Sequence, residues 1–300
     1  MENKPVSERL RKYGIPERVA VVQAGSLPKI QIKSNWSTAE IYLHGAHLTG
    51  FQKNGEPPLL FLSRQSHFAA NVAIRGGVPI CFPWFGPRAG EPAHGLARIS
   101  AWELAGTSAT QDGNVTVRLR LPKESLKAEW SALRTEFIVA VADTLTMELI
   151  VTNGSANKTL EFENCLHTYF HVGDIGAVSI SGLEKLPFDD FATGAGGARK
   201  LENDSVFRIS QETNRVYPDH AGVVEIRDES LKRIIRVEKF NSHSTVVWNP
   251  WTTQKLPDDF DSAEYKKMVC VESGNVKQDK ISLAPGESAA LKVILSSRSR

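Results

Sequence analysis

The sequence predicts an all-β protein: a large antiparallel β-sandwich with one or two short helices. Its dominant hydrophobic period is two residues, seen most clearly in residues 114–121 (NVTVRLRL), where every second side chain is apolar. That period is typical of strands with one buried face. Turn-forming pairs such as Asp112-Gly113 and Asn153-Gly154 separate many of these runs. Because helical segments do not alternate with the strands, a sandwich is favoured over a βαβ fold.

Apolar and alternating runs recur from one end of the chain to the other, and each predicts a strand. The expected strands are residues 29–32, 39–43, 114–121, 133–142, 145–151, 160–170, 178–180, 223–226, 234–237, 245–248, 268–271 and 289–295.

Two short helices are expected. The first is residues 7–13, within an N-terminal extension formed by residues 1–18. The second follows Pro257, because Asp258, Asp259 and Asp261 precede residues 264–267, the order of charges that a helix dipole favours. No repeat, low-complexity tract or linker divides the chain, so residues 1–300 are expected to form a single domain.

Composition excludes few functions. With 36 basic and 34 acidic residues, the chain has no overall field that indicates nucleic acid or a membrane surface as a partner. Its polar N-terminus lacks a signal-peptide pattern, and no stretch approaches the roughly 18 apolar residues of a membrane span. Cys81, Cys165 and Cys270 are odd in number and far apart, which argues against a disulfide framework. A monomeric, cytoplasmic protein is expected.

Residues 73–98 (AIRGGVPICFPWFGPRAGEPAHGLAR) interrupt the strand pattern. The segment holds four prolines, five glycines and three arginines, and it also contains His94. Irregular loops of this length in compact domains are usually functional or disordered, and Phe82, Trp84 and Phe85 argue against disorder. We therefore expect an ordered loop that lines a site, with a loop that merely covers a sheet edge as the alternative.

His167 and His171 have the H-x3-H spacing, which invites a metal-site interpretation. On a strand, residues four apart lie about 13 Å from each other, too far to share an ion. No CxxC or HExxH accompanies them, so we expect no metal and no other cofactor. A strand histidine is often a satisfied core or edge residue, which is the interpretation favoured for His171 and left open for His167.

Glu272 follows the apolar strand 268–271 and precedes Ser273-Gly274. A carboxylate at such a position is commonly solvated. It is also where a rigid element can hold a general base at the mouth of a site.

Together these segments resemble the D-hexose-6-phosphate mutarotases of the aldose 1-epimerase (galactose mutarotase-like) superfamily. The matching segments, in the family's order, are AIRGGVPICFPWFG (73–86), HGLAR (94–98), ENCLHTYF (163–170), VWNPW (247–251) and VCVESGN (269–275). The resemblance implies a β-supersandwich whose concave face holds the sugar. It also implies that His167 is the general acid and Glu272 the general base, and that Arg75 and Arg98 bind substrate, with its 6-phosphate as their target.

His94 and Asn214 are further candidate substrate-binding residues. The segment 213–217 reads TNRVY, with Asn214 where related proteins have an aspartate that touches the sugar. Asparagine keeps an acceptor oxygen but is neutral, so a weaker contact is expected there. Ala93 stands where some relatives have glutamine, a second difference that bears on which sugar fits.

The chemistry suits these residue types. Opening a hemiacetal takes a proton from the anomeric hydroxyl and gives one to the ring oxygen, and each transfer needs a group that titrates not far from neutrality. Arginine forks suit phosphate oxygens. The expected function is therefore interconversion of the α and β anomers of a hexose 6-phosphate. The alternatives are a mutarotase of neutral aldoses, a non-catalytic carbohydrate-binding sandwich that uses Trp84, Trp248 and Trp251, and a cupin-like metalloenzyme.

Overall fold

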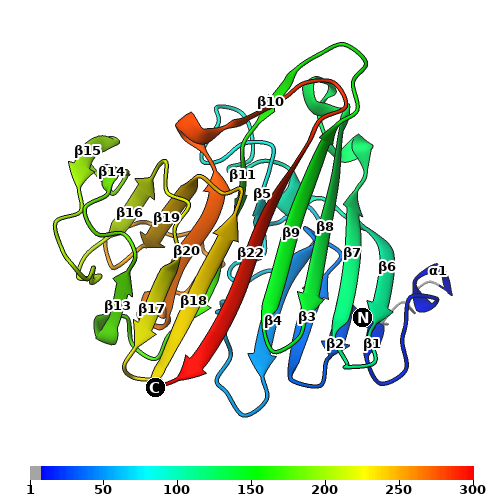
Figure 1. The fold of residues 1–300 in the computed structure, drawn as a ribbon, viewed down its shortest axis with the longest axis horizontal. Helices are drawn as coiled ribbons and strands as arrows, with labels where there is room; N and C mark the ends of the chain where they lie inside the picture. Colours follow the sequence, from blue (N-terminus) through cyan, green and yellow to red (C-terminus); the bar gives the residue numbers. More distant parts are fainter. Residues whose placement is uncertain (1–7) are drawn as a thin grey trace.

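The computed structural model describes residues 8–300 and confirms the all-β antiparallel fold class, with strands dominating every view (Figure 1). Sheet 1 is eight-stranded, in the order β13 (Val178–Ser181), β17 (Val224–Asp228), β18 (Arg233–Phe240), β22 (Ser288–Ser299), β9 (Leu145–Asn153), β8 (Leu133–Val141), β7 (Val115–Leu121) and β6 (Glu103–Ala109). The burial of β8 and β9 alternates strictly along each strand, as the period of two predicts.

Sheet 2 is also eight-stranded. Its order is β15 (Ala198–Leu201), β14 (Pro187–Asp190), β16 (Thr213–Tyr217), β19 (Ser244–Asn249), β20 (Met268–Asn275), β11 (Asn164–Leu166) and β5 (Ile80–Cys81), with β12 (Tyr169–His171) also paired to β20. Every residue of β20 is buried, because this central strand is covered on both faces.

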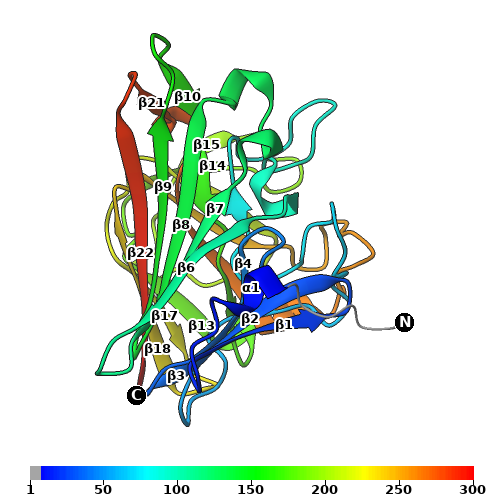
Figure 2. The same cartoon turned by 90° about the vertical axis from the view of Figure 1, so that its right-hand side faces the viewer.

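Two smaller sheets complete the β-structure. Sheet 3 has the order β1 (Val19–Ala24), β2 (Leu27–Lys33), β3 (Ser37–Tyr42) and β4 (His47–Lys53), and a separate pair joins β10 (Leu160–Phe162) to β21 (Ile281–Leu283). The helices are α1 (Glu8–Arg11) and the 3₁₀ turns η1 (Ala97–Ile99), η2 (Lys123–Ser125), η3 (Ala128–Trp130), η4 (Ile175–Ala177), η5 (Glu264–Lys267) and η6 (Lys277–Asp279). Figure 2 shows sheet 3 beside the long strands of sheet 1.

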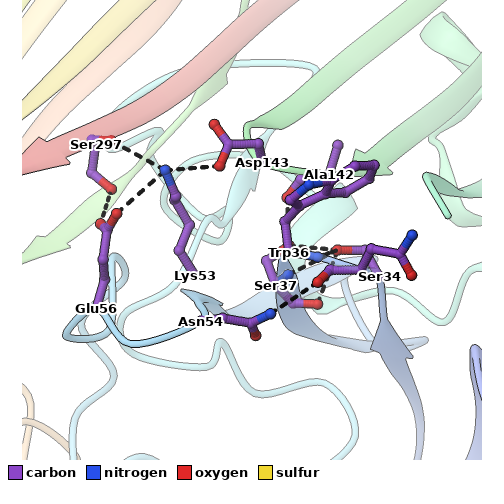
Figure 3. A network of polar contacts seen from close by, with 10 residues as sticks. Ser34, Trp36, Ser37, Lys53, Asn54, Glu56, Ala142, Asp143 and Ser297 are labelled. Atoms are coloured by element: carbon purple, nitrogen blue, oxygen red, sulfur yellow. Dashed lines mark hydrogen bonds and ion pairs between the residues drawn. The ribbon is translucent and has the colours of Figure 1, made fainter. Parts of the chain in front are cut away.

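One hydrophobic core joins the three larger sheets. It includes Leu119 of sheet 1, Val271 of sheet 2 and Ile30 of sheet 3, all fully or almost fully buried. Polar contacts add to this packing at the edge between sheets 3 and 1 (Figure 3). The ammonium of Lys53 donates to Asp143 at 2.9 Å and to the carbonyl of Ser297 at 3.4 Å.

Sequence and structure differ in three places. The expected strand 160–170 is divided into β10, β11 and β12, with His167 and Thr168 between the last two. The second expected helix is a single 3₁₀ turn, η5, and of the first only Glu8–Arg11 is helical, while residue 7 lies outside the described residues. Strands β1, β4, β5, β6, β14, β15, β16 and β21 were not expected. The burial of β15 has no alternation to detect, since all its residues are exposed.

None of the helices between residues 8 and 300 combines the length and apolar character that crossing a membrane requires.

Candidate active site

A pocket of ≈ 560 Å³ lies over sheet 2 and gathers residues from distant parts of the chain. All six residues singled out in the sequence line it: Arg75, His94, Arg98, His167, Asn214 and Glu272. The loop 73–98 supplies one wall and residues 254–260 supply another. The loop 73–98 is therefore ordered and lines a pocket, and its role as part of a functional site stays a prediction. His171 does not reach this pocket; it lines a larger groove beside sheet 3 instead.

Strand register builds the floor of the pocket. Leu166 lies opposite Ser273 and Tyr169 lies opposite Cys270, so the register is the same on both sides of the break in the strand. His167 therefore lies opposite Glu272, although no ladder hydrogen bonds join the two residues. Side chains directly opposite each other in a sheet point to the same face and interact.

Two rows of side chains run across neighbouring strands on this face of sheet 2. A first row across the sheet comprises His167, Glu272, Val246 and Val216; a second comprises Tyr169, Cys270, Trp248 and Asn214. Every member except Cys270 lines the pocket. The aromatic members enclose the imidazole: the ring of His167 stacks on Tyr169 with centroids 4.7 Å apart and meets Trp248 edge-on at 6.1 Å. These two rows surround a titratable pair with apolar and aromatic side chains, and Asn214 is the further polar side chain that they bring to the pocket.

Local sequence explains how the loop reaches this platform. Gly77 has φ +61°, and a Cβ there would lie 2.3 Å from the carbonyl oxygen of Leu48. Gly95 has φ +78°, and a Cβ would lie 2.1 Å from the carbonyl oxygen of Phe82. Only glycine permits these approaches, so the IRGG and HG motifs are backbone requirements that place Arg75 and His94 at the pocket.

His167 and Glu272 form a close buried pair. His167 Nε2 lies 3.3 Å from Glu272 Oε1, and the two side chains are 8% and 1% exposed. Burial, together with the positive charge of Arg98, lowers the pKa of His167 to about 3. Burial raises the pKa of Glu272 well above its ordinary value, against the opposing effects of the Cys165 hydrogen bond and Arg98. Burial thus moves both pKa values in the direction that favours the neutral form of each side chain.

The two arginines differ in their partners. Arg75 Nε donates to both carboxylate oxygens of Asp259, at 3.0 Å each. Arg98 is partly buried and lines the same pocket as the acid–base pair; its Nη2 donates to the carbonyl of Ala93 at 2.6 Å, and its buried Nε has no partner among residues 8–300. Of these two guanidinium groups, only that of Arg75 has a carboxylate partner among residues 8–300. The uncompensated positive charge of Arg98 at the pocket favours a bound anion.

His94 and Asn214 border the pair from opposite sides. His94 Nδ1 accepts a hydrogen bond from the Gly86 amide at 3.3 Å, and its ring meets that of His167 edge-on at 5.5 Å. Asn214 Nδ2 donates to the carbonyl of Phe191 at 3.4 Å, which leaves its own side-chain oxygen available to a ligand.

Sequence reasoning missed several residues that the structure brings to the site. Tyr169 lies within the ENCLHTYF segment, two positions after His167. Residues two apart on a strand point to the same face, so this spacing could have predicted that Tyr169 reaches the pocket. Lys277 lines the rim, with its ammonium 5.4 Å from the centroid of Phe191. Asp259 was interpreted as a helix-dipole charge, and its burial against Arg75 corrects that interpretation.

Three buried side chains at the floor of the pocket are close enough together to bind one metal ion. Donor atoms of His167, Cys270 and Glu272 all lie within 4.8 Å of one another, so these buried side chains could hold an ion. The spacing argument had tested His171 as the partner of His167. The structure instead brings Cys270 and Glu272, both of β20, close to His167. The expectation that no metal is needed stays a prediction.

The sequence model of the aldose 1-epimerase family matches residues 28–296. A protein of Escherichia coli (strain K12), provisionally named glucose-6-phosphate 1-epimerase, is 36% identical over 246 residues, which cover 78% of this chain and 79% of the relative. A Cenchrus ciliaris protein with the same provisional name is 33% identical over 269 residues, or 86% of this chain and 80% of the relative.

Solved structures of mutarotase-like proteins have the same fold as this chain. A provisionally named mutarotase from Salmonella typhimurium superposes with a TM-score of 0.85 at 28% identity and covers 96% of both chains. A galactose mutarotase-like protein from Clostridium acetobutylicum has a TM-score of 0.69 at 15% identity, with coverage of 94% of this chain and 98% of the other. The second likeness concerns the fold alone, and both confirm the galactose mutarotase-like architecture.

Proposed function

The chain belongs to the aldose 1-epimerase family, and on that premise we propose that it interconverts the α and β anomers of a hexose 6-phosphate, with glucose 6-phosphate as substrate. The observation that carries the proposal is the buried His167–Glu272 pair, 3.3 Å apart, in a pocket that also holds Arg75, which is paired with Asp259, and Arg98, which has no carboxylate partner among residues 8–300. The provisional names of the relatives support the same substrate.

The pair supplies both proton transfers. In the reactive form Glu272 is a carboxylate and His167 an imidazolium, with one proton held across their 3.3 Å contact. The carboxylate then takes the proton of the anomeric hydroxyl while the imidazolium protonates the ring oxygen; the C1–O5 bond breaks and a C1 carbonyl forms. Rotation about C1–C2 and closure on the other carbonyl face, with the proton transfers reversed, gives the second anomer.

Arg75 and Arg98 are the proposed phosphate ligands, and His94 and Asn214 the proposed contacts to sugar hydroxyls. A dianionic phosphate would satisfy the uncompensated guanidinium of Arg98, and hydrogen bonds to charged groups contribute about 1.5–3 kcal/mol each. A mutarotase of neutral aldoses has no use for this charge. A carbohydrate-binding module has no use for a buried titratable pair beside the aromatic side chains of its pocket.

Domain organisation, oligomeric state and cellular compartment are properties of the whole chain. Because the rows of sheet 2, the loop 73–98 and the segment 254–260 complete one pocket, we propose that the chain acts as a single domain and as a monomer. The cytoplasm is the proposed compartment, because Cys81, Cys165 and Cys270 are unpaired and buried.

Anomer exchange tests the function directly. The purified protein is mixed with freshly dissolved α-glucose 6-phosphate or α-glucose, and mutarotation is followed by polarimetry or by NMR exchange spectroscopy. Acceleration with a clear preference for the phosphorylated sugar is expected. Preference for glucose would assign the protein to neutral aldoses, and no acceleration of either sugar would leave a binding module.

A further inference from the structure

The contact between Arg75 and Asp259 uses one edge of the guanidinium. Both carboxylate oxygens accept from Nε, at 3.0 Å each, and the Asp259 side chain is 7% exposed. Nη1 and Nη2 of Arg75 make no hydrogen bond to any group within residues 8–300, and Arg75 lines the pocket. The pair of nitrogens at the end of the side chain is therefore left for a ligand.

That end is the part of arginine best suited to phosphate. Two parallel N–H groups from Nη1 and Nη2 match two oxygens of one phosphate. Arginine also has many side-chain rotamers, so a free guanidinium loses much conformational entropy when it binds. A carboxylate that fixes Nε removes part of this loss in advance, because it holds the side chain in one orientation before the ligand arrives.

The backbone around the pair is fixed as well. The amide of Arg75 donates to the hydroxyl of Ser66 at 2.8 Å, and its carbonyl accepts from the amide of Ser63 at 3.0 Å. The Ser63 hydroxyl in turn donates to the carbonyl of Asp259 at 3.5 Å. Asp258, the preceding residue on the same loop, is exposed and lies outside the pocket. Only one of the two neighbouring aspartates is built into this arrangement.

We propose that Asp259 is a positioning residue that aims Nη1 and Nη2 of Arg75 at the phosphate group of the sugar, and thereby sets the preference for phosphorylated over neutral aldoses. The inference rests on the proposed function. Asp259 touches neither the reacting atoms nor the phosphate; it acts through Arg75.

Removing Asp259 has two opposing effects on a bound phosphate. It frees the arginine, which weakens binding, and it removes a negative charge near the phosphate, which strengthens binding. Two substitutions separate these effects. Asp259→Asn keeps an acceptor oxygen for Nε and removes the charge, whereas Asp259→Ala removes both. If positioning dominates, Asn preserves phosphate binding and Ala does not.

The experiment compares wild type, Asp259→Ala and Asp259→Asn, with Asp258→Ala as the matched control. KM and kcat for anomer exchange are measured with glucose 6-phosphate and with glucose, and binding of inorganic phosphate is measured by calorimetry. We expect Ala to raise KM for glucose 6-phosphate and Kd for phosphate by roughly 10-fold, with kcat and the glucose reaction little changed. Asn should stay within about threefold of wild type, since it retains the acceptor.

Three results would overturn the inference: an unchanged or lower phosphate Kd for Ala, equal losses on both sugars, or an Asn variant as impaired as Ala. Failure of the proposed function looks different, because wild type itself would then not accelerate anomer exchange of glucose 6-phosphate. The phosphate calorimetry of the variants decides the positioning role in either case.

Discussion

Replacing His167 by asparagine tests the acid–base pair most directly. Asparagine keeps hydrogen-bonding capacity facing Glu272 but cannot carry a proton to the ring oxygen. Loss of a general acid usually slows a reaction by about 10²–10⁴-fold, equivalent to about 2.7–5.4 kcal/mol of transition-state stabilisation. Because the residue acts on the reacting atoms, the loss should appear in kcat and should be similar for phosphorylated and neutral sugars.

The buried imidazole also predicts an effect on stability, which serves as an independent measurement. Its pKa is about 3 in the folded protein, and about 6.5 is ordinary for an unfolded chain. Below pH 6.5 the unfolded chain therefore binds a proton that the folded protein does not, so this residue makes the native state less stable as pH falls toward 3. At pH 5 the cost is about 2 kcal/mol. His167→Asn removes the titrating group, so its unfolding free energy should depend less on pH.

The assay combines NMR exchange of glucose 6-phosphate anomers at pH 7 with urea unfolding at pH 7 and pH 5. Reduced exchange together with a shallower pH dependence of stability supports the assignment. Near-wild-type exchange by a folded variant would refute the proposed role of His167. A pH dependence of unfolding identical to wild type would refute the burial argument for its low pKa.

Four further predictions concern the base, the arginines, metals and a second buried histidine. Glu272→Gln should slow exchange of both sugars by about 10²–10⁴-fold without unfolding the protein; a variant that keeps wild-type rates would remove Glu272 from the mechanism. Arg98→Ala or Arg75→Ala should raise KM for glucose 6-phosphate far more than for glucose, by the equivalent of about 1.5–3 kcal/mol, and inorganic sulfate should compete less well at higher salt. Equal effects on both sugars would make these arginines structural. Activity should survive EDTA, whereas its loss, with recovery on adding a divalent ion, would give a metal role to the three donors beneath the pocket. Burial lowers the pKa of His47 to about 3, although its Nε2 bonds the Gly76 carbonyl at 2.7 Å. Between pH 7 and pH 4, wild type should therefore lose about 3 kcal/mol of stability that His47→Gln does not lose; parallel pH dependences would contradict this.

Local pattern in the sequence was sufficient for much of the fold. The period of two located β7, β8 and β9 closely, since these strands have one face toward the core and one toward solvent. The same method could not find β15, where all side chains are exposed, or divide the apolar run 160–170 into three strands. An apolar run indicates burial, but it does not say where a ladder of hydrogen bonds stops.

For the candidate site as well, some features could be predicted from the sequence and others could not. The motifs around Arg75, His94, His167 and Glu272 were readable because glycine, proline and histidine are rare in the middle of ordinary strands, and the resemblance supplied their roles. The register of β11 and β12 on β20, which sets His167 opposite Glu272, was not readable. Nothing in either segment specifies which residue of the other it will face.

By itself, the sequence determined the β-class of the protein, the segments that break the strand pattern and the residue types available for chemistry, because these depend on periodicity and composition along the chain. Tertiary structure alone decided the opposite pKa shifts of His167 and Glu272 and the pairing of Arg75 with Asp259. The physical reason is that burial and electrostatic interaction depend on which groups are brought together in space. His167 and Glu272 are 105 positions apart in the chain, and Arg75 and Asp259 are 184 apart, so each pair meets only when the protein folds.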